Sequence, residues 1–203
     1  MVEKITDYEF AILQLYRNKY DASFHIRAIA KLLGTSHVTL LPYLRRLEKN
    51  KILISRKVGK NKEYMLNPDN ILTKEYLTIA EELETIRYLD KNFLIKKISE
   101  KILSLDLMGA IVLFGSYAKN YATDVSDIDL LCLGKPSEIT VEEIKKIGKT
   151  YGKKISVKTA SPEDFKDGLR SGDALVSEIV NDHIILQNSE LFVRLLWRHY
   201  VGR

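Results

Sequence analysis

Residues 113–131 read LFGSYAKNYATDVSDIDLL, and this stretch decides the fold. An apolar run leads into Gly115 and Ser116, and ten residues later Asp127 and Asp129 open a second apolar run. Alternate side chains of a strand point to the same side, so we expect both carboxylates at one point in space. Paired oxygen ligands suit Mg²⁺, which completes its shell with water and substrate phosphates.

The Gly-Ser pair adds a second chemical feature to this stretch. Gly115 allows close backbone approach, and Ser116 stands where it would cap the next helix. Helix N-termini bind phosphate groups. Two metal-binding acids that face a phosphate site are the minimal apparatus for phosphoryl or nucleotidyl transfer.

The spacing Gly-Ser-x10-Asp-x-Asp resembles the nucleotidyltransferase superfamily named for DNA polymerase beta, over about residues 105 to 187. More narrowly, it resembles the minimal (MNT-type) nucleotidyltransferases of prokaryotes, several of which act as antitoxins. This resemblance implies that Gly115 and Ser116 hold the triphosphate of a nucleoside triphosphate. It also implies that Asp127 and Asp129 hold Mg²⁺ and are catalytic.

Two features depart from the family pattern. Many relatives have an Arg after Gly-Ser and a Gly three residues later, where this sequence has Tyr117 and Asn120. The family also uses a third carboxylate, on a later strand, to complete the second metal site and activate the attacking hydroxyl. The matching segment, residues 153–158, contains no acid, and Ser156 is the aligned position. A nucleotide site is therefore expected, while transfer itself stays an open question.

Length and composition allow one large or two small domains in a protein expected in the cytoplasm. The chain has 203 residues, of which 45% are hydrophobic, enough for two cores. No apolar run approaches the ~18 residues of a membrane span, and the first residues contain no apolar signal region, so no membrane partner is expected. The single cysteine, Cys132, cannot form an internal disulfide and is expected in the core.

Charge is unevenly distributed along the chain. Residues 1–68 contain 13 Lys and Arg against 6 Asp and Glu, whereas residues 69–203 contain 19 against 21. The basic surplus of the whole chain therefore belongs to its N-terminal third. Such segregation indicates a polyanionic partner for that part.

The N-terminal third has the pattern of a helix-turn-helix followed by a hairpin. Apolar residues recur at helical spacing over 25–33 and again from about 35 to 50, and two strands are expected at 52–57 and 62–66. Their order resembles the winged helix-turn-helix domain of prokaryotic and archaeal regulators over about 1–68. That resemblance implies double-stranded DNA as partner, with the second helix in the major groove.

The expected DNA contacts lie on the second helix and on the basic hairpin, or wing. They are Ser36, His37, Thr39, Tyr43, Arg46, Arg56, Lys57, Lys60 and Lys62. An ordinary solvated basic face is the alternative, and similar hairpins also pack against partner proteins. Pro42 falls inside the expected helix, where it should kink the helix or delay its start.

The segment between the two domains is helical in pattern from Ile71 to about Leu105, with a break near Asp90. One stripe alternates spacings of four and three residues: Leu72, Tyr76, Ile79, Leu83 and Ile86. This stripe either packs on its own domains or pairs with a second copy, and a homodimer is expected through it.

These patterns together predict a mixed α+β and α/β chain. We expect a winged helix-turn-helix domain at 1–68, a helical connector at 69–105, and a nucleotidyltransferase fold at 106–203, a mixed sheet with helices. The expected function is DNA binding combined with NTP–Mg²⁺ binding and possible transfer of a nucleoside monophosphate to a hydroxyl. The alternative is a non-catalytic transcription regulator or MNT-type antitoxin that uses the fold for nucleotide sensing or dimerisation.

Overall fold

The computed structural model describes residues 7–105 and 107–201, which form two compact units. The first unit contains the described residues up to Ala80 and those from Leu196 onward, and the second contains Glu81–Leu195. Within the described ranges, no helix combines the length and the apolar character that crossing a membrane requires.

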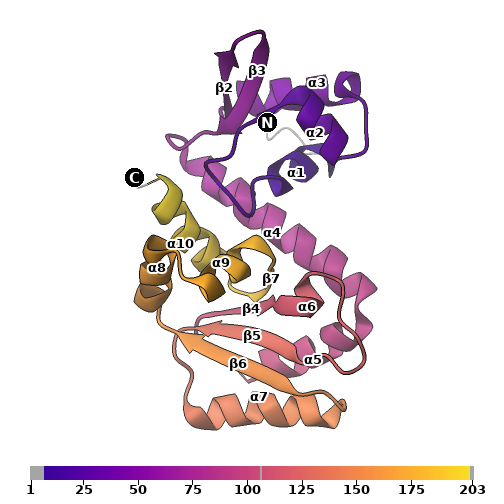
Figure 1. Cartoon of the computed structure of the whole chain (residues 1–203), viewed down its shortest axis with the longest axis vertical. Coiled ribbons are helices and arrows are strands. Elements are labelled where there is room, and N and C mark those ends of the chain that lie inside the picture. Colours follow the sequence, from indigo (N-terminus) through magenta and orange to yellow (C-terminus); the bar gives the residue numbers. More distant parts are fainter. Residues whose placement is uncertain (1–6, 106, 202–203) are drawn as a thin grey trace. The chain divides into compact units, whose positions relative to one another are not determined.

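The first unit has the element order of a winged helix (Figure 1). Its elements are α1 (Asp7–Gln14), β1 (Phe24–His25), α2 (Ile26–Leu32), α3 (His37–Lys49), β2 (Leu53–Val58) and β3 (Asn61–Leu66). The expected hairpin is the antiparallel pair of β2 and β3. The short strand β1, which the sequence did not predict, adds to β3 and gives the order β1-β3-β2.

Helix α3 begins and packs as its sequence predicts. The Ser36 side chain caps it by accepting a hydrogen bond from the Thr39 N–H at 3.1 Å. Its apolar side, Leu40, Leu44 and Leu47, is buried in the core of the unit. Pro42 lies inside the helix and does not delay its start, which stays at His37.

The second unit combines helices with a four-stranded sheet. Its elements are α4 (Ile71–Lys91), which begins in the first unit, α5 (Phe93–Leu103), β4 (Ala110–Phe114), α6 (Gly115–Ala118), β5 (Ile128–Leu133), α7 (Glu138–Thr150), β6 (Ile155–Ala160), α8 (Pro162–Ser171), α9 (Ala174–Asn181), β7 (Ile184–Gln187) and α10 (Ser189–Val201), which ends in the first unit. The break between α4 and α5 is at Asn92, two residues after the expected position.

The strand order is β6-β5-β4-β7. Only the pair β5 and β6 is parallel among these strands, so the sheet is mixed, as expected.

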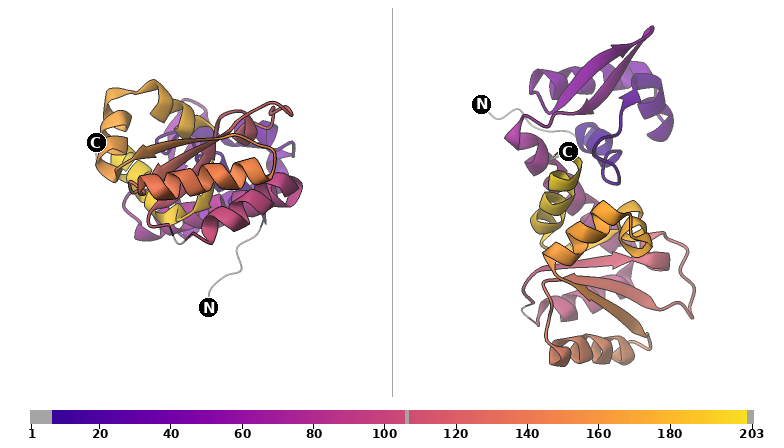
Figure 2. Two further views of the ribbon diagram at one scale, coloured as in Figure 1. Left: turned by 90° about the horizontal axis from the view of Figure 1, so that it is seen from below. Right: turned by 60° about the vertical axis from the view of Figure 1, so that its left-hand side comes forward.

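One face of this sheet is covered by α5 and α7 (Figure 2). Ile128, Leu130 and Cys132 of β5 are buried in that layer, together with Ile98 of α5 and Ile144 of α7. Because strand side chains alternate, the residues between them point to the other face of the sheet. The core side of β5 thus fixes which side its acidic residue occupies.

Candidate functional site

The acid pair and the glycine bend meet at one end of the paired strands β4 and β5. Asp129 is the second residue of β5 and stands opposite Phe114, the last residue of β4. Gly115 follows directly and has a φ of +70°. A Cβ built on Gly115 would lie 2.6 Å from Oδ2 of Asp129. Only glycine therefore fits this approach, for its backbone conformation and for the space.

The bend itself differs from the expected cap. Helix α6 has Phe114 at its N-cap with no side-chain hydrogen bond, and Ser116 is already its second residue. The prediction that Ser116 caps the helix is therefore wrong, because the left-handed Gly115 starts the turn one residue earlier. Backbone N–H groups of a first helical turn have no partner within the helix, so they are available to an anion.

Ser156 takes the place where the family would have its third acid. The parallel pairing of β5 and β6 sets Asp129 beside Ser156. The Ser156 hydroxyl lies near the Asp129 carboxylate and lowers the pKa of that acid. This hydroxyl supplies no further negative charge.

The surroundings of Asp129 raise the cost of ionising its carboxyl group. Burial raises the pKa of Asp129, and the negative charges of Asp127 and Glu178 raise it further. The Ser156 hydroxyl and the charge of Lys158 oppose the rise in this pKa but do not cancel it. A cation would relieve this repulsion.

Two charged contacts at the site were missed by the sequence reasoning. Lys154 Nζ donates to Asp127 Oδ2 at 2.5 Å from the start of β6. Lys119, which ends α6, lies with its Nζ 2.6 Å from Oε1 of Glu178 on α9. The position of Lys154 could have been inferred, because residues 153–158 were expected to form the neighbouring strand. Glu178 comes from a helix far along the chain, and its spacing gives no signal.

The residues expected to contact DNA occupy α3 and the wing. Ser36, His37 and Thr39 are exposed at the start of α3, and Ser36 also serves as its cap. The Tyr43 ring stacks on Tyr8 with centroids 5.0 Å apart. The wing residues Arg56, Lys57, Lys60 and Lys62 are exposed and line a shallow groove of about 290 Å³.

Three of these basic side chains are already paired within the unit. Arg46 makes two hydrogen bonds of 2.5 Å to the buried Glu9. Arg56 pairs with Glu63 at 3.3 Å and Lys62 with Glu48 at 2.7 Å. Lys57 and Lys60 form no ion pair within the part of the chain that the structure describes. The charge available at the wing is therefore concentrated at its tip.

Comparison with known proteins identifies the second unit. Residues 95–186 match the family described as "Nucleotidyltransferase domain". The chain carries a nucleotidyltransferase domain. This match confirms the resemblance expected from the Gly-Ser and Asp-x-Asp spacing.

The nucleotidyltransferase domain is joined to the winged helix, and one solved structure resembles part of the chain. It is the crystal structure of MepR, a transcription regulator of the Staphylococcus aureus multidrug efflux pump MepA. The likeness covers 51% of this chain and 82% of MepR, with 23% identity and a TM-score of 0.35. No curated protein matches the sequence significantly. The winged-helix description rests on the order and pairing of the elements given above.

The donors of the nucleotidyltransferase domain suit one hard cation. Among the described residues, no cluster of three or more His, Cys, Asp or Glu side chains is arranged to hold a metal ion. Asp127 and Asp129 supply two carboxylates, and Mg²⁺ is commonly bound by one or two carboxylates with substrate phosphates. The raised pKa of Asp129 is the sign of a site that favours added positive charge. The pair therefore fits a magnesium ion that arrives with a nucleotide.

Proposed function

We propose that this chain is a DNA-binding protein whose nucleotidyltransferase domain binds a nucleoside triphosphate with Mg²⁺ and transfers the nucleoside monophosphate to a hydroxyl. The observation that carries the proposal is the contact of Asp129 with Gly115, because it joins an acid to a phosphate-binding bend. Asp127 and Asp129 would hold the ion. The N–H groups of the bend at Gly115 and Ser116 would bind the phosphates.

Magnesium, when bound, neutralises phosphate charge and stabilises the transferring phosphoryl group. The remaining work falls to the side chains of this domain. Ser156 lies beside Asp129 in the strand register and favours the charged form of its carboxylate by lowering its pKa. Lys154 bridges to Asp127 and brings positive charge to the rim of the site. With serine at the third position, the proton of the attacking hydroxyl would leave to water.

A second function is favoured by that same serine. A regulator that has lost its general base would keep nucleotide binding and use it to sense nucleotides, or would use the fold for dimerisation. An MNT-type antitoxin is a further form of this non-catalytic role. In each form the winged helix binds operator DNA and the protein acts in the cytoplasm.

Two measurements separate transfer from sensing. Calorimetry with ATP, GTP, CTP and UTP, with and without Mg²⁺, tests binding, and Asp127→Asn is expected to abolish its metal dependence. Release of labelled pyrophosphate, or self-labelling from α-labelled nucleotide, tests transfer. Binding without transfer would support the sensor, and loss of both would leave a DNA-binding regulator alone.

We also propose that α4 joins two copies of the chain. Leu72, Ile79 and Ile86 are 51%, 40% and 56% exposed, while Leu77 and Tyr88 on other sides of the helix are buried. The exposed residues follow a spacing of seven, as in the seam of a coiled coil. Sedimentation of Ile79→Lys should show monomers, whereas a wild type that stays monomeric at all concentrations would exclude the dimer.

A further inference from the structure

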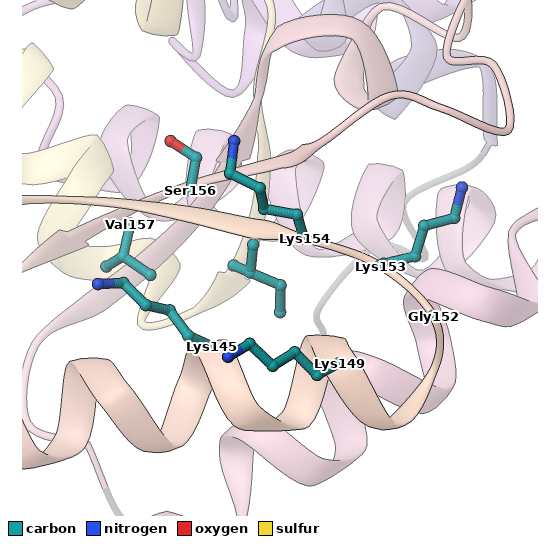
Figure 3. A pocket seen from close by; sticks show the side chains of 8 residues that line it. Lys145, Lys149, Gly152, Lys153, Lys154, Ser156 and Val157 are labelled. Carbon is teal, nitrogen blue, oxygen red and sulfur yellow. The ribbon is translucent and has the colours of Figure 1, made fainter.

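The free edge of the sheet carries a lysine-lined groove outside the acid pair. β6 is the outermost strand, and a groove of about 680 Å³ lies between it and α7. Its lining is Lys145, Lys149, Gly152, Lys153, Lys154, Ile155, Ser156 and Val157. Four lysines thus line the groove at the sheet edge (Figure 3), and two of them are paired at exposed positions, Lys145 with Glu142 and Lys154 with Asp127.

The lysines approach the groove from two elements. Lys145 and Lys149 are four residues apart on α7, so they share one helix face, and both line the groove. Lys153 and Lys154 come from the segment that enters β6. Val157 points toward the helix and gives the groove an apolar side (Figure 3).

Two residues of the groove lining also adjoin the proposed transfer site, which consists of Gly115, Ser116, Asp127 and Asp129. Lys154 and Ser156 project from the side of β6 opposite to Val157 (Figure 3). Lys154 donates to Asp127, and Ser156 stands beside Asp129 in the strand register. Lys153 Nζ lies 5.8 Å from the centre of the Tyr117 ring, directly after Ser116 in α6. The lysines at the start of β6 therefore lie between the groove on one side and Tyr117 and the two acids on the other.

We infer that this groove binds a single-stranded nucleic acid, which is the acceptor of the transfer. Lysines spaced along an open groove match the repeating phosphates of a strand, and the apolar side formed by Ile155 and Val157 accepts unpaired bases. An acidic peptide would use the lysines but would leave the apolar side without a matching group. Binding rests on the groove alone, whereas the acceptor role rests on the proposed function.

The transfer at this acceptor is a substitution at phosphorus. The terminal hydroxyl oxygen of the strand forms a bond to the α-phosphorus of the nucleoside triphosphate. The bond from that phosphorus to the oxygen bridging to the β-phosphate breaks, and pyrophosphate leaves with the electron pair. The hydroxyl proton passes to water. The strand is thereby extended by one nucleotide.

The test uses the full chain with Lys57→Ala and Lys60→Ala in every sample, which removes the wing tip as a second site. Fluorescence anisotropy with a short, dye-labelled single-stranded RNA measures affinity against salt concentration. Adding K145A, K149A and K153A should weaken binding on the order of tenfold, since three phosphate contacts are lost. The slope of log affinity against log salt should become shallower by roughly 2, at about 0.7 per contact.

A charge-matched control comes from the other end of the same strands. Lys135, Lys166 and Arg170 pair with Asp164, Glu163 and Asp167, as Lys145 of the groove pairs with Glu142. Removing either set of three cations changes the net charge by the same amount. K135A/K166A/R170A should bind RNA like the parent protein. Equal loss in both triple variants would overturn the groove, because it would show attraction by net charge alone.

Two further arms keep the test decisive. Because Lys153 also donates to the Asp124 carbonyl, K145E/K149E provides a variant confined to the surface of α7. The proposal would be overturned if K145E/K149E bound RNA as tightly as the parent protein. It would also be overturned if poly-glutamate displaced the labelled RNA from the parent as readily as unlabelled RNA does. Calorimetry with Mg²⁺ and nucleotide should be the same for the parent and K145E/K149E. RNA bound without any nucleotide binding would refute the proposed function and leave the groove standing.

Discussion

The wing and the transfer site both gather like charges, but they tolerate the repulsion differently. At the wing, Lys57 and Lys60 are exposed at the tip of a hairpin, where water screens them. At the transfer site, Asp129 is half-buried beside Asp127, and the cost appears as a raised pKa. Repulsion between solvent-exposed lysines costs little and is relieved by an extended polyanion. Repulsion between half-buried acids is relieved by one bound cation.

The two regions also differ in how firmly their charged side chains are held in ion pairs within the chain. In the first unit, Glu9, Glu48 and Glu63 hold Arg46, Lys62 and Arg56. At the transfer site, Lys154 reaches Asp127 from a side chain that is 77% exposed, so it can move aside at little cost. A count of charges in the sequence does not separate these cases.

The largest effect is expected when the transfer site loses one of its acids. Asp129→Asn should weaken Mg²⁺-dependent nucleotide binding by at least roughly 100-fold. Residues that only hydrogen-bond to a metal ligand already change metal affinity by about 10–100-fold, and loss of a ligand should cost more. Asp124→Asn, an exposed acid of the same loop, should leave the affinity unchanged. Calorimetry with and without EDTA measures both. Retained metal dependence in Asp129→Asn would show that the acid pair does not hold the ion.

The next effect concerns the close approach on which the site depends. Gly115→Ala combines a left-handed φ of +70° with a Cβ only 2.6 Å from Asp129, so we expect a loss of more than about 2 kcal/mol in the free energy of unfolding. Urea titration measures this loss. Gly172→Ala is the matched control, because its φ is +69° and nothing lies within 4 Å of the new Cβ.

The difference between these two alanine variants isolates the contact with Asp129. Gly172→Ala should cost about 1 kcal/mol, which is the backbone term alone. Adding Asp129→Ala to Gly115→Ala should recover the excess. If the two glycine variants lose equal stability, the acid and the bend are further apart than the structure has them.

At the wing, the expected effect is smaller and depends on which lysines are removed. Lys57→Ala with Lys60→Ala should weaken duplex DNA binding about tenfold and make the salt slope shallower by about 1.8, at 0.9 per phosphate. Arg56→Ala with Lys62→Ala should change affinity less, because both side chains are held by glutamates. Anisotropy at several salt concentrations compares the two pairs. A larger loss in the second pair would mean that the ion pairs open on binding DNA.

Many of the helices and strands can be predicted from the sequence because they depend on local patterns of residues. The helix-turn-helix, the hairpin and the two strands around Asp127 and Asp129 rest on apolar spacing and on capping residues such as Ser36. The absence of an acid on β6 was also readable, since Ser156 falls at the register position beside Asp129. These features need only neighbours in the chain or one strand pairing.

The remaining features depend on contacts that no local pattern encodes. The strand β1 has two residues and exists only because β3 lies beside it. The ion pair of Arg46 with Glu9 joins the two helices α1 and α3. Glu178 acts on Asp129 from α9, which packs on α8 far along the chain from the acid pair. Long-range packing therefore decides which charges remain available.

The smallest expected effect compares two aspartates of the nucleotidyltransferase domain whose pKa values move in opposite directions. Burial and neighbouring acids raise the pKa of Asp129, so its folded form loses stability as pH rises through that value. The Ser161 cap and Lys135 lower the pKa of Asp164 to about 2, so its stabilising contribution is present at neutral pH and is lost as pH falls toward 2. Asp129→Asn should therefore raise the melting temperature at pH 7 in EDTA, with a gain that shrinks toward acidic pH. Asp164→Asn should lower the melting temperature at pH 7, with a loss that also shrinks toward acidic pH. Thermal melts from pH 3 to 8 test the pair, and two variants that shift in the same direction would contradict the electrostatic account of the site.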